Sequence, residues 1–449
     1  MSGFIPHTPD EVAEMLAFLG IESVDQLFET IPSAIRLSRD SLKLPDSKSE
    51  FDVLEELETI AAKNHALGSD FISFAGGGAY DHDIASAIKS LSSRSEFLTA
   101  YTPYQPEVAQ GVLQALFEYQ SLVSRLSGLE ISNASLYDGA SSLVEAINLT
   151  VAQSKNGLVW ISQGINPAYR QVVNTFASGT GHSIQEIPVR NGSTSWPIEN
   201  STLPGTIVIG YPNYLGLLEP MEQIITFAQA HDIKLIFAYD PVSMALLRSP
   251  GELGADVAIA EGQPFGVGLN FGGPYVGLFS TKEKYVRHLP GRLVGETVDS
   301  TGQIGYVTTL RTREQDIRRE KASSNVCTNQ TLIAITTAIS MSWLGKSGVR
   351  ELANRCYSGT QYLKDLLAGI DGVEIYSSLP SVREFAVKTK MPSEQLVDKM
   401  IEEGFLAGIP ILEGFENSDV YDSLLVTVTE KRTRAQIENY ASTLERIIR

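Results

Sequence analysis

The strand-like segment 234–240 ends in the carboxylate of Asp240, and no lysine occurs between Asp240 and Lys282. A carboxylate at a strand end, followed one strand later by a lysine, is the pair that pyridoxal-phosphate chemistry needs. The amine forms the imine, and the carboxylate keeps the pyridine nitrogen protonated. Here the carboxylate is present and the amine is missing. An ordinary α/β domain with an Asp at a strand end explains the same residues.

A second candidate site is a predicted turn from a strand into a helix at 135–142 (SLYDGASS). Free N–H groups and the positive dipole end at a helix N-terminus can bind a phosphate. The alternative is a simple helix cap, with Asp138 or Ser141 as the capping side chain. The chain has neither a GxGxxG after a strand nor a GxxxxGK[ST] sequence, so no nucleotide-binding motif is recognised.

Two further segments carry residue types that are common at binding sites. Tyr101 and Tyr104 precede a predicted helix at 107–126, on a loop where aromatic residues often line a ligand or partner site. The segment 311–321 then holds four arginines and a lysine. A solvated helical face explains such a run without any function. Alternatively, the arginines bind carboxylates of a partner or substrate.

The elements that must position these residues follow from the hydrophobic pattern. From about residue 95 to 345, short β-rich runs alternate with helix-period stretches, which predicts a mainly parallel sheet with helices on both faces. The expected strands are 158–162, 183–189, 206–210, 234–239 and 255–260, and the expected helices are 140–153, 167–178 and 220–231.

The chain divides into three predicted parts. Residues 1–90 form a helical segment, whose first helix begins at the capping sequence Thr8-Pro9-Asp10-Glu11. Residues 91–345 form the large domain. Residues 346–449 form a small α+β domain, with strands expected at 373–376, 384–389 and 424–429 and helices at 393–403 and 433–448.

Composition excludes several classes of protein. The 449 residues contain 35 Lys and Arg against 53 Asp and Glu, a net charge of −18, which repels nucleic acid and anionic membranes. Cys327 and Cys356 lack metal-ligand spacing and imply no disulfide framework, so we expect no metal. The first residues are acidic, and no uncharged apolar run of 18 residues occurs. We therefore expect a cytoplasmic protein.

Together, the motifs resemble one family over essentially the whole chain. The chain is similar to the glycine cleavage system P-proteins, and within them to the alpha subunits (subunit 1) of two-chain glycine dehydrogenases (decarboxylating). AYTPYQPEVAQG and TREQDIRREKASSNVCTNQ carry the most specific resemblance. FIPHTPDEVAEML, LFETIPSAIRL, FAGGGAYDHD, LYDGASSLVEA, QPFGVGLNFGGPYVGL and LLVTVTEKRTRAQI extend it.

The resemblance implies an α/β, fold-type-I, pyridoxal-phosphate-transferase-like architecture. This fold has a mostly parallel seven-stranded sheet with helices on both faces, plus a small C-terminal α+β domain. It also implies that pyridoxal phosphate and its Schiff-base lysine belong to the homologous beta subunit (subunit 2), because Gln263 aligns with the lysine position. This chain would hold no cofactor covalently. Its vestigial cofactor-binding candidates are Asp240 for the ring nitrogen and Asp138, Gly139, Ala140 and Ser141 for the phosphate.

The implied activity belongs to the assembled complex. With the beta subunit, the chain would decarboxylate glycine and transfer the aminomethyl group to the lipoyl group of the H-protein, in a two-plus-two heterotetramer. The candidates for completing the partner's site or forming the interface are Tyr101, Tyr104, Arg311, Arg313, Arg318 and Arg319.

Two other interpretations remain open. The chain could be an independent pyridoxal-phosphate enzyme whose lysine is Lys234 or Lys282. Lys234 begins its strand, about 20 Å from Asp240 at the usual rise per residue, and Lys282 is expected at a solvated helix start. The chain could also be a purely regulatory or structural partner of the beta subunit.

Overall fold

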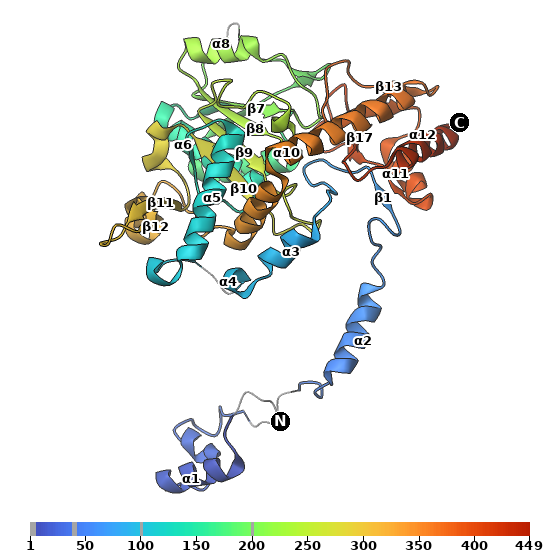
Figure 1. The fold of residues 1–449 in the computed structure, drawn as a ribbon. Coiled ribbons are helices and arrows are strands. Elements are labelled where there is room, and N and C mark those ends of the chain that lie inside the picture. Colours follow the sequence, from blue (N-terminus) through green and yellow to red (C-terminus); the bar gives the residue numbers. More distant parts are fainter. Residues whose placement is uncertain (1–5, 38–42, 99–101, 199–201) are drawn as a thin grey trace. The chain divides into compact units, whose positions relative to one another are not determined.

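The computed structural model describes residues 6–37, 43–98, 102–198 and 202–449 (Figure 1). The chain divides into two compact units, Met1–His65 and Ala66–Arg449, and each is described by itself. Tyr101 lies outside the described residues.

The first unit is helical. Helix α1 (Pro9–Leu19) begins at the predicted cap, where the Glu11 N–H donates to Thr8 Oγ1 and the Thr8 N–H donates to the Glu11 carboxylate. A 3₁₀ turn, η1 (Val24–Phe28), and helix α2 (Glu50–Ala61) follow. None of the described side chains of this unit is buried.

The second unit is built on a seven-stranded sheet. Its strand order is β2-β10-β9-β8-β7-β3-β4, and β10 is the one strand that runs antiparallel to its neighbours. All five predicted strands match to within two residues at each end; β9 begins two residues late and β4 ends two residues early. The strands are β2 (Ile131–Ser132), β10 (Gly277–Thr281), β9 (Val257–Glu261), β8 (Lys234–Tyr239), β7 (Thr206–Tyr211), β3 (Leu158–Ser162) and β4 (Ser183–Ile187).

Helices cover both faces of this sheet, as the alternating pattern predicts (Figure 1). One core packs beneath α5 (Gln110–Ser127), α8 (Glu222–Ala230) and the first part of α10 (Thr331–Ala368). The other packs beneath α6 (Gly139–Ser154) and α7 (Pro167–Thr180). The largest fully buried side chain, Trp160, lies in β3, between β7 and the edge strand β4. The predicted α/β class is confirmed.

A second, antiparallel sheet has the order β13-β14-β17-β16 and packs with two helices around its own core. Helix α10, which has a non-helical residue at Gly345, runs from the large core to this one. The elements are β13 (Val373–Ile375), β14 (Glu384–Thr389), α11 (Ser393–Glu402), β16 (Ile409–Ile411), β17 (Ser423–Thr427) and α12 (Arg434–Ile448).

Short elements complete the unit. Strand β1 pairs in parallel with β15, so the segment after residue 71 joins the C-terminal sheet region. Glycine is required within this segment, because a Cβ on Gly76 would lie 2.1 Å from Thr427 Oγ1. No helix among the described residues is long and apolar enough to cross a membrane. The short elements are β1 (Ile72–Ser73), α3 (Ser86–Ser92), α4 (Ser95–Leu98), β5 (Val189–Arg190), β6 (Ser193–Thr194), β11 (Leu293–Val298), β12 (Ile304–Thr309) and β15 (Phe405–Leu406).

Candidate active-site pocket

The candidate site lies where parallel strands end. Asp240 directly follows β8, Glu261 ends β9, and Gln263 comes two residues later. Since β8 and β9 are parallel neighbours, their carboxyl ends meet at one edge of the sheet, the edge where open α/β folds bind ligands. The N-terminus of α6 contributes Gly139, whose N–H binds Glu261. The structure therefore brings together the predicted cofactor-site candidates, Asp240, Gln263 and the start of α6.

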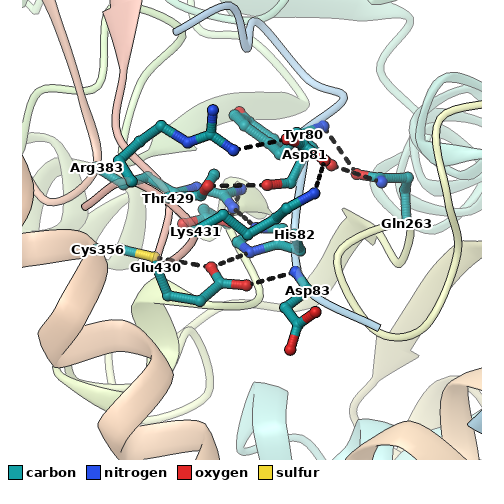
Figure 2. Close-up of polar contacts among 12 residues, drawn as sticks. Tyr80, Asp81, His82, Asp83, Gln263, Cys356, Arg383, Thr429, Glu430 and Lys431 are labelled. Atoms are coloured by element: carbon teal, nitrogen blue, oxygen red, sulfur yellow. Dashed lines mark hydrogen bonds and ion pairs between the residues drawn. The ribbon is translucent and has the colours of Figure 1, made fainter. Parts of the chain in front are cut away.

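Gln263 is fully buried and both ends of its amide are bound. Its Oε1 accepts a hydrogen bond from the Tyr80 N–H at 2.9 Å, and its Nε2 donates to the Tyr80 and Val267 carbonyls at 2.9 and 2.8 Å. Figure 2 shows the Gln263 side chain directed at the main chain around Tyr80. An amide that satisfies three hydrogen bonds in a buried position holds the loop in place. It supplies no nucleophilic amine.

Asp240 is bound by the protein's own side chains. Its Oδ1 accepts a hydrogen bond from the Arg383 guanidinium, and its Oδ2 accepts from both the hydroxyl and the N–H of Ser243. The Arg383 guanidinium also stacks on the Tyr80 ring, 3.5 Å from its centroid. Burial alone would lower the pKa of Arg383, but the Asp240 carboxylate raises it, so the guanidinium keeps its charge in this buried position.

The N-terminus of α6 is also occupied. Asp138 caps the helix by accepting the Ser141 N–H at 2.7 Å, which is the simple-cap alternative. Glu261 accepts the Gly139 N–H at 3.0 Å on one oxygen and the Val276 and Gln263 N–H groups on the other. Burial raises the pKa of Glu261 to about 7, opposed by these hydrogen bonds.

Two cavities adjoin these residues. One, of about 100 Å³, is lined by Asp240, Arg383 and Glu261. The other, of about 370 Å³, is lined by Asp138, Ala140 and Glu261. Glu261 and Tyr169 line both cavities. The pocket around Asp240 is thus smaller than the roughly 300–1,000 Å³ that is usual for ligand sites.

The two lysines nearest in sequence are bound elsewhere. Lys234 begins β8 and pairs with Asp232 at 2.7 Å. Lys282 directly follows the antiparallel strand β10 and pairs at 2.8 Å with Asp256, which directly precedes β9. Both amines therefore lie at the start of the parallel strands, at the opposite sheet edge from Asp240. Neither serves the candidate site.

The predicted tyrosine and arginine candidates partly converge. The guanidinium groups of Arg292 and Arg311 lie 4.8 and 5.5 Å from the centroid of the half-exposed Tyr104 ring. Its hydroxyl accepts a hydrogen bond from Arg292, a buried residue that the sequence did not single out. Arg311 also pairs with Asp316 at 3.1 Å.

The rest of the basic segment forms short turns instead of one charged helical face. They are η6 (Arg311–Arg313), α9 (Gln315–Arg318) and η7 (Arg319–Lys321). Arg313 is partly buried and donates to the Leu289 carbonyl. Arg318 and Arg319 are exposed, so the structure separates the four arginines into different environments.

Comparison with known proteins identifies the family of the chain. The family model of the glycine cleavage system P-protein matches residues 2–444. This chain belongs to that family. The chain is 42% identical to the probable glycine dehydrogenase (decarboxylating) subunit 1 of Desulforamulus reducens, over 98% of this chain and 99% of the relative. It is 43% identical to the protein of the same name from Chlorobium limicola, with the same coverage.

Solved structures agree with this assignment. The P-protein chain resembles a crystal structure of glycine decarboxylase (P-protein) of the glycine cleavage system in inhibitor-bound form, with a TM-score of 0.90, 38% identity and 99% of each chain covered. It also resembles a NifS-like protein with a TM-score of 0.60 and 11% identity, over 84% of this chain and 99% of the other, which is a likeness of fold alone. The predicted fold-type-I pyridoxal-phosphate-transferase-like class is confirmed.

The residues of this P-protein chain do not fit pyridoxal phosphate, the cofactor of the fold family. Gln263, which the family resemblance aligns with the lysine, is bound to main-chain groups, and Asp240, which it aligns with the ring-facing carboxylate, is paired with Arg383. At the start of α6, the N–H groups of Gly139 and Ser141 are bound by carboxylates. The space beside Gly139 is also filled, because a Cβ on this residue would lie 2.2 Å from the Tyr169 hydroxyl. The Asp240 and Asp138 carboxylates and the N–H groups of Gly139 and Ser141 are thus already bound within the chain.

Proposed function

We propose that this chain is the subunit of a two-chain glycine dehydrogenase (decarboxylating) that does not hold the cofactor. With a second, lysine-bearing subunit it decarboxylates glycine and transfers the aminomethyl group to the lipoyl group of an H-protein. The observation that carries the proposal is the buried Gln263 amide, whose hydrogen bonds are all made to the main chain. Family membership and the subunit 1 names of its relatives support it.

Pyridoxal phosphate in the second subunit supplies the electron sink for decarboxylation. In this chain, Tyr104, Arg311, Arg318 and Arg319 are our candidates for the contact with that subunit and its site. Arg311 lies 5.5 Å from the half-exposed Tyr104 ring, and Arg319 lines the same cavity as Tyr104. Cationic groups beside an aromatic ring suit a partner that presents carboxylates. Arg313 is tied to the Leu289 carbonyl and would hold the segment in place.

This chain and the second subunit would have homologous large domains, and only the second subunit would have an intact cofactor site. Such a pair is expected to be obligate, with a buried interface area above the roughly 1,600 Å² of a standard complex. The chain should therefore co-purify with subunit 2 when both are expressed together. Glycine–bicarbonate carbon exchange should require both chains and be absent from either one alone. Full exchange by subunit 2 alone would contradict the proposal and favour a regulatory role for this chain.

A second measurement addresses the cofactor directly. Incubation of this chain with pyridoxal phosphate, followed by borohydride reduction, should leave no stoichiometric pyridoxyllysine. A single fully modified lysine would instead support an independent enzyme. We also propose a cytoplasmic location, which the free thiols of Cys327 and Cys356 support.

A further inference from the structure

The pocket of this subunit differs from a cofactor site in more than its missing lysine. We propose that the chain excludes pyridoxal phosphate by self-ligation: the Glu261 carboxylate occupies the phosphate cradle, and the Arg383 guanidinium occupies the carboxylate that would face the ring nitrogen. Restoring a lysine at position 263 is therefore not sufficient to bind the cofactor. The inference builds on the proposed function, in which the cofactor belongs to the second subunit.

The first internal ligand takes the place of an anion. One carboxylate, Glu261, receives N–H donors from the first residue of α6, from Val276 and from Gln263, at 3.0 to 3.2 Å. Converging backbone N–H groups at a helix N-terminus are the usual setting for a bound phosphate. The nearby Asp138 carboxylate adds to the negative charge there. A phosphate dianion would have to displace one carboxylate and approach another.

The second internal ligand takes the place of a protonated ring nitrogen. A pyridinium N–H donates one hydrogen bond to a carboxylate, and Arg383 makes that bond to Asp240 here. Ser243 occupies the other oxygen of Asp240. The guanidinium is planar and stacks on the Tyr80 ring, as an aromatic cofactor ring could. Arg383 is 3% exposed, so water does not weaken the pair as it would at the surface.

A chain of side chains, buried except for the partly exposed Glu430, holds Arg383 in this position (Figure 2). Its Nη1 donates to His82 Nε2 at 2.7 Å, and His82 Nδ1 lies 2.6 Å from the Glu430 carboxylate. Arginine has no acceptor, so Nε2 must accept and Nδ1 must carry the hydrogen that Glu430 receives. The thiol of Cys356 closes the chain, 3.7 Å from Glu430.

The same assignment argues against a metal at this cluster. His82, Cys356 and Glu430 offer ligand atoms within 4.8 Å of one another. However, Nδ1 of His82 carries a hydrogen, and the lone pair of Nε2 already accepts a hydrogen bond from Arg383. Neither nitrogen therefore has a free lone pair for a metal ion. These groups position Arg383 and do not form a binding site.

The segment that carries His82 is itself fixed from both sides. Gln263 binds the Tyr80 main chain, and Asp81 pairs with Lys431 at 2.6 Å (Figure 2). Asp81 also pairs with Arg432 at 2.8 Å. Arg383 and Lys431 come from the C-terminal region, whereas Gln263 follows strand β9 of the large sheet. The self-ligated pocket is thus built jointly by the two packed regions of the second unit.

The test uses full-length chains and measures their binding of pyridoxal phosphate. The first variant, Gln263→Lys, restores only the amine. The second adds Glu261→Ala and Arg383→Ala, which remove both internal ligands. The matched control adds Glu261→Gln and Arg383→Lys to Gln263→Lys, so that the cradle stays filled and the cation stays in place. Dissociation constants come from titration of the imine absorbance, and borohydride reduction with peptide mapping locates the modified lysine.

We expect Gln263→Lys and the control to bind weakly, without stoichiometric modification at position 263. The variant without internal ligands should bind about 10- to 100-fold more tightly for each ligand removed, as for charge-assisted hydrogen bonds, and be modified at position 263. Stoichiometric modification of Gln263→Lys alone would overturn the inference. So would a folded triple variant that binds no more tightly. In either case the proposed function would stand, because the natural chain still lacks the lysine.

If the triple variant does not fold, inorganic phosphate provides an independent test. The single variant Glu261→Ala should be stabilised against thermal unfolding by phosphate, relative to Glu261→Gln in the same buffer. An equal response of the two variants would overturn the assignment of Glu261 as the occupant of a phosphate cradle.

Discussion

The ion pair between Arg383 and Asp240 gives the sharpest test of how this pocket is held. Changing Arg383 to Ala removes the cation and leaves the Asp240 carboxylate, 14% exposed, without a counterion. Breaking one side of a buried pair typically costs about 3–5 kcal/mol, because the remaining charge stays desolvated. The hydroxyl and N–H of Ser243 still bind Asp240, so we expect a loss near the lower end, about 3 kcal/mol.

A double variant separates the pair from the packing of its side chains. Adding Asp240→Asn to Arg383→Ala removes the stranded charge, so it should recover part of the loss. Urea unfolding of the full-length chains, followed by tryptophan fluorescence and by circular dichroism, measures both variants. Arg434→Ala, which breaks the exposed pair with Glu438, is the matched control and should leave the midpoint unchanged.

The result that would refute this reasoning is a small effect. A loss below about 1 kcal/mol for Arg383→Ala is the value of an exposed ion pair. It would mean that water reaches Asp240 freely and that the pocket is open. Equal losses for the single and double variants would mean that the cost lies in the packing of Arg383 on Tyr80, and not in the charge.

Other expectations follow from individual side chains. Burial raises the pKa of Glu145 from 4.5 to about 7, so its contribution to stability is complete below pH 4.5 and is lost as the pH rises through 7. Glu145→Gln should therefore flatten the fall of the unfolding free energy between pH 5 and pH 8 by up to about 3 kcal/mol, measured by urea unfolding; an unchanged slope would contradict this. Arg313→Ala should lower the unfolding free energy by about 1–3 kcal/mol in the same assay. Arg318→Ala should change stability little. If Arg318→Ala nevertheless no longer co-purifies with subunit 2, Arg318 contacts that subunit. Gly139→Ala should cost about 1–3 kcal/mol, since its Cβ would lie 2.2 Å from the Tyr169 hydroxyl, and wild-type stability would disprove that contact.

The fold could be predicted from the sequence because strands and helices leave local patterns of apolar residues. The apolar runs that became β3, β7 and β8 are continuous and bounded by polar turns, and parallel strands buried on both faces require such runs. Strand β10 was missed, since it follows directly on a glycine-rich segment that reads as a loop. The very short strands β2 and β15 depend on their partners and have no pattern of their own.

The site was only half visible in the sequence. Asp240 could be found because it follows a strand, and Gln263 because the family resemblance places it. Arg383 and His82 could not be found, since their partners lie 143 and 348 positions away and only the fold brings them together. Glu261 could have been found in the sequence, because its carboxylate ends strand β9 two residues before Gln263. Asp240 stands in the same way directly after strand β8.

The N-terminal unit has a consequence for the lifetime of the chain in the cell. Its helices α1 and α2 have 11 and 12 residues, and isolated helices of that length are marginal in water. With no described side chain buried, hydrophobic burial adds little to hold them. Proteases should therefore begin to digest a chain that lacks its partner within this unit, while the packed remainder is still folded. Turnover of the protein would then follow any imbalance in its synthesis relative to subunit 2.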